Sequence, residues 1–271
     1  MHWPGDFRAS PQLPESSALY IYLLDADDDL AAEFDVRMLV AARQLATAKV
    51  LEVEVGACDL REWFAAVADG PGLIILDGLM AIDARVGSRT ATELVGAGDL
   101  LQPTRAQLDE LLERTDTWHA LAATRLALLD AEFAERVRPW PQITQALLRR
   151  AGERTINVDA LRAITCQPRL ELRLVLLFWH LASRWGRVEP SGIHLSLPLT
   201  HRLLGQLIGA ERPSISHALG RLARCGLVVG TAGDWHLQGN LGDHLEYLSE
   251  RTSTLPAADG QRPLSRLVSG A

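Results

Sequence analysis

The stretch of residues 197–239, LPLTHRLLGQLIGAERPSISHALGRLARCGLVVGTAGDWHLQG, has the pattern of two short helices followed by a hairpin. Thr200 is a favourable N-cap before apolar residues that recur at helical spacing as far as Ile208. Gly209 stands where a helix often ends in a left-handed residue, and Pro213 suits the first turn of a second helix. Two helices joined by a short turn that contains glycine form the helix-turn-helix unit, whose second helix can enter the major groove of DNA.

The second predicted helix has an apolar and a polar face. Its apolar face carries Ile215, Ala218, Leu219 and Leu222, and its opposite face carries Ser214, Ser216, His217 and Arg221. No carboxylate lies between Pro213 and Leu227, which favours DNA binding over the alternative of an ordinary helical hairpin in a core. Residues 226–229 and 235–237 predict two short strands with glycine in their turn. They complete a winged helix-turn-helix.

Composition and charge restrict the class of protein. Of 271 residues, 48% are hydrophobic and 23% charged, enough for one large core or two modest ones. No apolar run reaches about 18 residues and residues 1–17 lack a signal pattern, so we expect a cytoplasmic, nucleoid-associated protein without a membrane partner. The net charge is −7, yet residues 186–240 hold 5 Lys and Arg against 3 Asp and Glu. Base contacts and dimerisation would therefore have to supply much of the affinity for DNA.

Two further patterns precede this module. Short apolar runs separated by Gly and Asp, such as GLIILDG at 72–78, predict the closely spaced strands of a barrel or jelly roll. A long helix is predicted from Pro141 to about Cys166, and a hinge near Pro168 would separate it from the next helix. This long helix has a mediocre coiled-coil seam at near-heptad spacing, formed by Leu147, Ala151, Arg154, Val158, Leu161 and Thr165.

The order of these parts resembles the Crp/Fnr family of dimeric transcription regulators across roughly residues 50–240. The most specific match is Thr200-His201-Arg202 with GQLIG at 205–209 and RPSISHAL at 212–219, while VGAGDLL at 95–101 looks like the family's sensor. The resemblance implies an α+β fold with an N-terminal β-roll (jelly-roll-like) sensor domain, a long dimerisation helix and a C-terminal winged helix-turn-helix domain. The expected parts are an N-terminal tail and helical segment (1–48), a β-roll effector-like domain (49–137), a dimerisation helix (138–167), the winged helix-turn-helix domain (168–240) and a partly mobile C-terminal extension (241–271).

The resemblance also implies partners and contact residues. A homodimer would bind a palindromic operator in double-stranded DNA, and RNA polymerase is a further candidate partner. The residues expected to contact DNA are Thr200, His201, Arg202, Arg212, Pro213, Ser214, Ser216, His217 and Arg221. Arg212 would clasp a guanine, which is worth about 1–3 kcal/mol of discrimination. His217 occupies a position where many relatives carry Arg, so base reading there would differ.

The sensor half departs from the pattern of cyclic-nucleotide binders. After Gly98-Asp99 the expected Gly-Glu is absent, and no Arg-Ser or Arg-Thr precedes the strand at Leu126 to grip a phosphate. Asp116 would also repel a phosphate, so control by cyclic AMP is disfavoured and the effector is unknown. A different effector pocket is a candidate, formed by Trp118, His119 and Arg125. The competing interpretation is a core Trp with a hydrogen-bonded His.

Other classes of function have weaker support. The three cysteines form no Cys-x-x-Cys pair or Cys/His cluster, so we expect no metal and no cofactor. No nucleophile elbow or phosphate loop is found, so we expect no enzyme. Asp27-Asp28-Asp29 is interpreted as a solvated helix start. The alternative function is a winged-helix protein-interaction module with a vestigial sensor domain.

Overall fold

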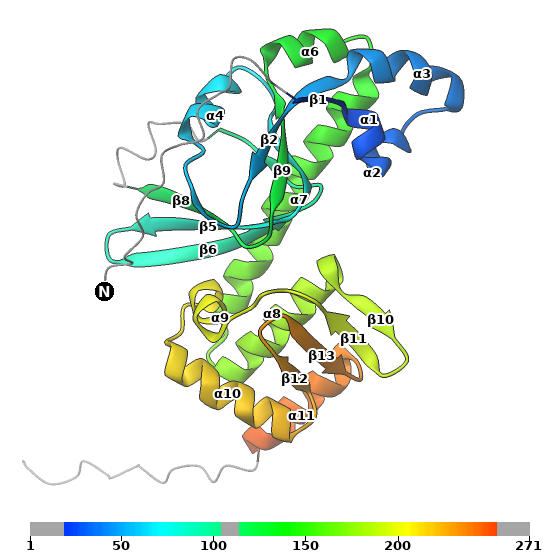
Figure 1. Cartoon of the computed structure of the whole chain (residues 1–271). Helices are drawn as coiled ribbons and strands as arrows, with labels where there is room; N and C mark the ends of the chain where they lie inside the picture. Colours follow the sequence, from blue (N-terminus) through cyan, green and yellow to red (C-terminus); the bar gives the residue numbers. More distant parts are fainter. Residues whose placement is uncertain (1–18, 104–113, 254–271) are drawn as a thin grey trace, which may run out of the picture.

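The computed structural model describes residues 19–103 and 114–253, and it has two parts joined by a long helix (Figure 1). An N-terminal β-roll is followed by helix α7 and then by a helical domain with its own small sheet. The predicted α+β fold, with a β-roll, a long helix and a winged helix-turn-helix domain, is confirmed. Within the described residues, no helix is long and apolar enough to cross a membrane.

The β-roll consists of two antiparallel sheets. The first has the strand order β1-β2-β9-β4-β7 and the second β3-β8-β5-β6. The strands are β1 (Leu19–Tyr22), β2 (Thr47–Val53), β3 (Gly56–Cys58), β4 (Gly72–Asp77), β5 (Leu79–Val86), β6 (Arg89–Gly96), β7 (Leu100–Leu101), β8 (Thr115–Ala120) and β9 (Thr124–Leu129). The apolar run in β4 is buried on both faces: Leu73 and Ile75 point into the roll, whereas Ile74 and Leu76 pack under the helices. Double burial explains why this strand shows no alternation of apolar and polar residues.

In the part of the chain that the structure describes, five short helices surround the roll. They are α1 (Leu23–Ala26), α2 (Asp28–Ala31), α3 (Val36–Leu45), α4 (Arg61–Ala66) and α6 (Ala131–Val137). Asp130 caps α6, because its carboxylate accepts a hydrogen bond from the Phe133 amide at 2.8 Å. Strand β1 pairs with β2, so the described residues before residue 48 belong to the first sheet and its helices rather than to a separate segment.

Asp27 is not the solvated side chain that its acidic neighbours predict. It caps α2 through the Leu30 amide, 3.0 Å away, which confirms the helix start. Its carboxylate also forms an ion pair with Arg150 of α7, and the two side chains are only 10% and 6% exposed. Asp27 therefore ties the N-terminal helices to the long helix, a contact across 123 residues that periodicity does not reveal.

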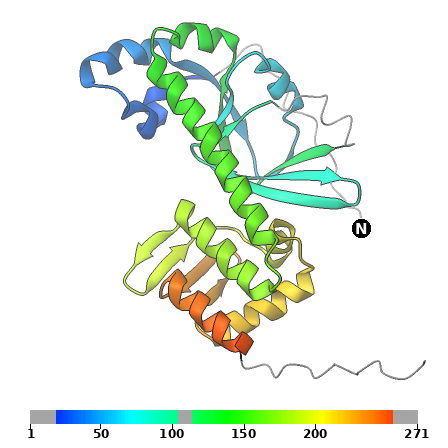
Figure 2. The same cartoon turned by 180° about the vertical axis from the view of Figure 1, so that it is seen from behind.

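Helix α7 (Pro141–Thr165) runs from the β-roll to the second domain (Figure 2). Part of its predicted seam faces the same chain, because Leu147 is buried under the roll and Arg154 pairs with Glu93 of β6, whereas Val158 is 37% exposed. The most exposed apolar side chains of α7 lie outside this seam, at Leu148 and Ile156, which are 64% and 69% exposed. The helix ends where proline predicts, before α8 (Leu170–Trp185).

The C-terminal domain contains more strands than the sequence predicts. Its elements are β10 (Arg187–Glu189), β11 (Gly192–Leu195), α9 (His201–Ile208), α10 (Arg212–Arg224), β12 (Val228–Thr231), β13 (Asp234–Gln238) and α11 (Leu241–Ser253). The predicted wing hairpin, β12 and β13, is half of an antiparallel sheet ordered β10-β11-β13-β12. Helix α11 is fixed to this domain because buried His244 accepts from Trp179 Nε1 at 3.0 Å and donates to the Gln238 carbonyl. Residues 254–271 of the predicted mobile extension lie outside the described residues.

The two domains share a continuous hydrophobic core. Leu79, Ala81 and Leu94 of the roll belong to the same cluster as the buried residues of α8 and α9. At the edge of this contact, Arg184 of α8 donates to Asp99 Oδ2 at 2.5 Å and to the Leu94 carbonyl at 3.1 Å. The orientation of the helix-turn-helix is therefore set by direct packing on the sensor.

Candidate nucleic-acid interface

The first helix of the pair, α9, begins and ends at the residues that the sequence indicates. The Thr200 hydroxyl accepts from the Leu203 amide at 3.2 Å, and Gly209 adopts the left-handed conformation with φ 65°. Gly205 allows the turn to fold back on the helix, since a Cβ there would lie 2.4 Å from the Ala210 carbonyl oxygen. The turn thus holds the start of α10 tightly against α9.

Helix α10 buries one face and presents the other to solvent. Ile215, Ala218, Leu219 and Leu222 form the buried face, as predicted. At 100° per residue, the centre of the opposite face carries Pro213, His217, Gly220 and Arg224. A Cβ at Gly220 would meet no atom within 4 Å, so the backbone there is open to close approach by a ligand.

Three of the predicted contact residues, His201, Ser216 and Arg221, form side-chain contacts within the chain. The Ser216 hydroxyl donates to the Arg212 carbonyl at 3.1 Å, and His201 Nδ1 lies 2.8 Å from the same hydroxyl. Arg221 reaches back to Glu171 of α8, with Nε 2.6 Å from the carboxylate. Arg221, expected in the groove-facing set, therefore has an ion-pair partner within the chain, and its side chain stays 47% exposed.

The exposed face of α10 is cationic. Neither Arg212 nor Arg224 has an ion-pair partner within residues 19–103 and 114–253, and the face has no carboxylate beyond the N-cap residue Glu211. Arg224 was missing from the predicted contact set. Its position follows from the helical wheel, which places it one turn after Gly220 and close to the direction of His217.

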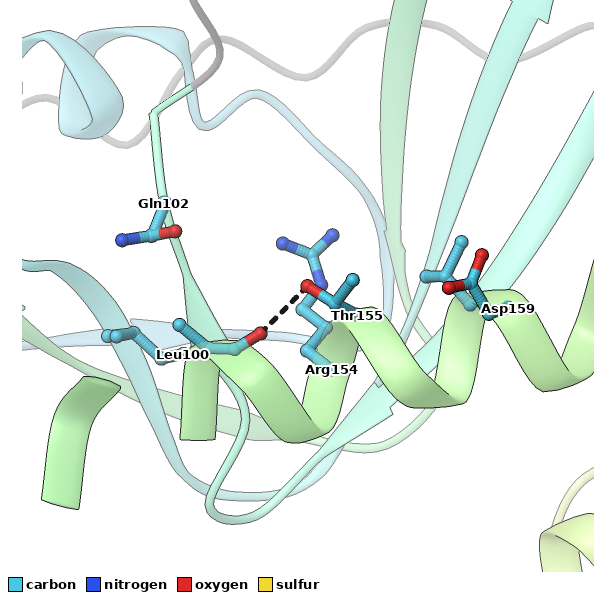
Figure 3. Close-up of a pocket in the computed structure, with 7 residues that line it drawn as sticks. Leu100, Gln102, Arg154, Thr155 and Asp159 are labelled. Carbon is cyan, nitrogen blue, oxygen red and sulfur yellow. Dashed lines mark hydrogen bonds between the residues drawn. The ribbon is translucent and has the colours of Figure 1, made fainter. Parts of the chain in front are cut away.

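The sensor domain has a small cavity between β7 and α7. It has a volume of about 240 Å³ and is lined by Leu100, Gln102, Ala151, Arg154, Thr155, Val158 and Asp159. Figure 3 shows Arg154, Thr155 and Asp159 on α7 at one side and Leu100 and Gln102 at the other. Arg154 forms two hydrogen bonds with the Glu93 carboxylate, at 3.0 and 2.8 Å, and its charge is thereby already paired.

The predicted effector residues do not line this cavity. Trp118 and His119 are neighbours on β8 and point to opposite faces, with Trp118 packed against Phe64 in the roll. Arg125 lies on β9 of the other sheet and forms an ion pair with Asp77 at 2.5 Å. These side chains do not converge, so the set Trp118, His119 and Arg125 is corrected, and the core interpretation fits Trp118.

Comparison with known proteins agrees with this geometry. The family model described as the Crp-like helix-turn-helix domain matches residues 172–237, which include most of α8, the two helices of the turn and most of the wing. Residues 172–237 are a Crp-like helix-turn-helix domain. The sequence resemblance to Crp/Fnr regulators is thus confirmed in the part that would bind DNA.

Solved structures extend the likeness beyond this domain to the whole fold. A mutant of CooA from Carboxydothermus hydrogenoformans is 15% identical with a TM-score of 0.57, covering 86% of this chain and 96% of CooA. FixK2 from Bradyrhizobium japonicum is 13% identical with a TM-score of 0.55, covering 73% and 96%. A global nitrogen regulator from Synechocystis sp. is 25% identical over 114 residues, 41% of this chain and 51% of that protein. The match therefore spans about half of that regulator's length.

Proposed function

We propose that this Crp-type regulator binds a palindromic operator in double-stranded DNA as a homodimer, with α10 of each protomer in the major groove. The observation that carries the proposal is the exposed face of α10, which offers arginine, histidine and hydroxyl groups and no carboxylate. Such a face suits the acceptors of base edges and phosphates. The protein would act in the cytoplasm, on the chromosome.

The contacts divide into two kinds. Arg212 in the first turn of α10 and His217 in the middle of its exposed face are placed to contact base edges, while Gly220 allows the helix to approach closely. Arg224 at the end of the helix and the N-terminal turn of α9 from Thr200 are placed to meet phosphates. Arg221 would act indirectly by holding α10 to α8.

The dimer would form through α7. Leu148, Gly152 and Ile156 are spaced four residues apart and form an exposed line on the side of the helix away from the roll. A Cβ at Gly152 would meet no atom within 4 Å, so a second helix can approach there. Replacing both Leu148 and Ile156 with Glu should give monomers in sedimentation-velocity experiments. The matched control is Val188→Glu, because Val188 is 82% exposed but lies on β10.

Cyclic AMP is not the expected signal. The cavity of about 240 Å³ is smaller than the roughly 300–1,000 Å³ of typical ligand pockets. Its cation, Arg154, is held by Glu93, and Asp159 adds a negative charge at the wall. We expect cyclic AMP to leave operator affinity unchanged; a clear increase in affinity would overturn this part of the proposal.

Selection of random duplexes followed by fluorescence anisotropy tests the function. The expected result is a two-fold symmetric site with half-sites about 34 Å apart, bound with an affinity that falls steeply with salt. The alternative, a protein-interaction module, predicts no preferred duplex even at low salt. Selection without enrichment would therefore contradict the proposal.

A further inference from the structure

Three side chains with metal-binding atoms converge on the solvent-facing side of the wing sheet. His194 on β11 is directly opposite His236 on β13 in the antiparallel register, and Asp234 is two residues before His236. Because side chains alternate along a strand, Asp234 and His236 point to the same face, and Trp235 between them points into the core. The sheet itself thus sets the arrangement of the three groups.

The distances show that these groups already interact. The Asp234 carboxylate oxygen lies 2.8 Å from His194 Nε2 and 3.1 Å from His236 Nε2. The two imidazole rings are stacked, with centroids 4.7 Å apart and planes at 19°. One donor atom of each residue lies within 4.8 Å of the others.

We propose that His194, Asp234 and His236 form a binding site for a divalent transition-metal ion of the Zn²⁺ type. Two imidazole nitrogens and one carboxylate oxygen are ligands that Zn²⁺, Co²⁺, Ni²⁺ and Cu²⁺ accept, whereas Mg²⁺ and Ca²⁺ prefer all-oxygen sites. Tetrahedral Zn²⁺ with bonds of about 2.0–2.1 Å needs donor atoms roughly 3.3 Å apart. The two distances from the Asp234 oxygen, 2.8 and 3.1 Å, are within about half an ångström of this value, and the histidine nitrogens lie within 4.8 Å of each other.

Glu189 on β10 completes the surroundings of this site. Its carboxylate lies 3.8 Å from Nδ1 of His194, on the side of the ring away from Asp234. A metal at Nε2 leaves the proton of the neutral imidazole on Nδ1, where Glu189 can accept it after a small rotation. Carboxylates in this position commonly orient metal-bound histidines and raise their basicity.

The site has a consequence for DNA binding, which rests on the proposed function. The metal-free face carries the negative charge of Asp234 next to the turn of the wing hairpin and that of Glu189 at the end of β10. A bound divalent ion would add two positive charges to the same domain that presents α10. It would therefore favour phosphate contacts by the wing.

Isothermal titration calorimetry of the untagged full chain with Zn²⁺, after chelator treatment, tests the site without DNA. A Cys166→Ser background removes the exposed thiol, which is a competing ligand. We expect one Zn²⁺ per chain, lost when His194 or His236 is replaced by Ala. Glu189→Gln should weaken binding by about 10- to 100-fold. The matched control is His119→Ala, because His119 also lies 3.8 Å from a carboxylate, that of Asp83, but in the sensor domain.

Asp234→Asn keeps the size of the side chain but removes the carboxylate ligand, so it should weaken Zn²⁺ binding without unfolding the domain. The thermal melt of each variant checks that it remains folded. Co²⁺ gives an independent readout, since its visible absorption reports nitrogen and oxygen ligands and should disappear in the same variants. No binding of Zn²⁺, or binding that survives loss of His194 and His236, would overturn the proposal. These results do not depend on whether the protein binds an operator, so the two proposals can fail separately.

Discussion

Replacing Arg150 with Ala should destabilise the β-roll far more than the same change at the adjacent Arg149. The Arg150 side chain is 6% exposed and its partner Asp27 is 10% exposed, with Arg150 Nη2 2.6 Å from the carboxylate. Burial would lower the pKa of Arg150, but the hydrogen bonds and charge of Asp27 raise it overall, so the guanidinium stays charged. Removing the arginine leaves a buried carboxylate without its counter-charge.

The expected cost follows from this burial. Loss of one partner of a buried ion pair costs about 3–5 kcal/mol. For a protein of this size each kcal/mol lowers the melting temperature by about 2–4 °C, so the Arg150→Ala melt should fall by roughly 6–20 °C. Arg149 is 49% exposed and pairs with Glu33 at the surface, so Arg149→Ala should cost less than about 1 kcal/mol.

Differential scanning calorimetry of both variants measures the difference. Asp27→Asn adds a second test, because Asn is as good an N-cap as Asp and thus removes the charge while keeping the cap of α2. It should destabilise the protein nearly as much as Arg150→Ala. If Arg150→Ala and Arg149→Ala melt within 2 °C of each other, the reasoning about the buried pair is wrong.

Three other predictions concern DNA contact, domain packing and thiol reactivity. Arg224→Ala should weaken binding to all duplexes about equally and reduce the salt slope by about 1, whereas Arg221→Ala, which removes an internal ion pair, should leave the slope unchanged. Arg184→Ala leaves the buried carboxylate of Asp99 without its counter-charge, and should lower the free energy of unfolding in urea by about 3–5 kcal/mol. A decrease of less than 1 kcal/mol would show that this ion pair does not hold the two domains together. Burial raises the pKa of the Cys58 thiol to about 11, so at pH 8 this thiol should resist alkylation while the exposed Cys166 reacts. Peptide mass spectrometry of the alkylated protein measures both; equal labelling would contradict the burial of Cys58.

The sequence alone was sufficient to predict structure where the conformation of a segment depends on residues close to it in the chain. The cap at Thr200 and the left-handed Gly209 each act within a few residues of the chain, and each is found where predicted. The apolar runs of the β-roll strands and the length of α7 follow from burial patterns of the same kind. These features determine the fold class.

Contacts between distant segments could not be predicted in this way. The ion pairs of Asp27 and of Arg221 join residues 123 and 50 positions apart, and each changes the role that the sequence indicates. The strands β10 and β11 were missed because each has only three or four residues and one of their apolar side chains, Val188, is exposed. Arg224 is a different case, since its place on the exposed face could have been read from helical geometry alone.

The most direct test of the central claim, that α10 reads DNA sequence, is to repeat the duplex selection with Arg212→Ala and His217→Ala. Each variant should lose preference at particular positions of the half-site, and loss of Arg212 should reduce discrimination there by about 1–3 kcal/mol, or roughly 5- to 150-fold. Because both side chains are exposed, both variants should keep the melting temperature of the wild type. If the selected sequence and its affinity are the same for the wild type and both variants, α10 does not read the operator and the account is wrong.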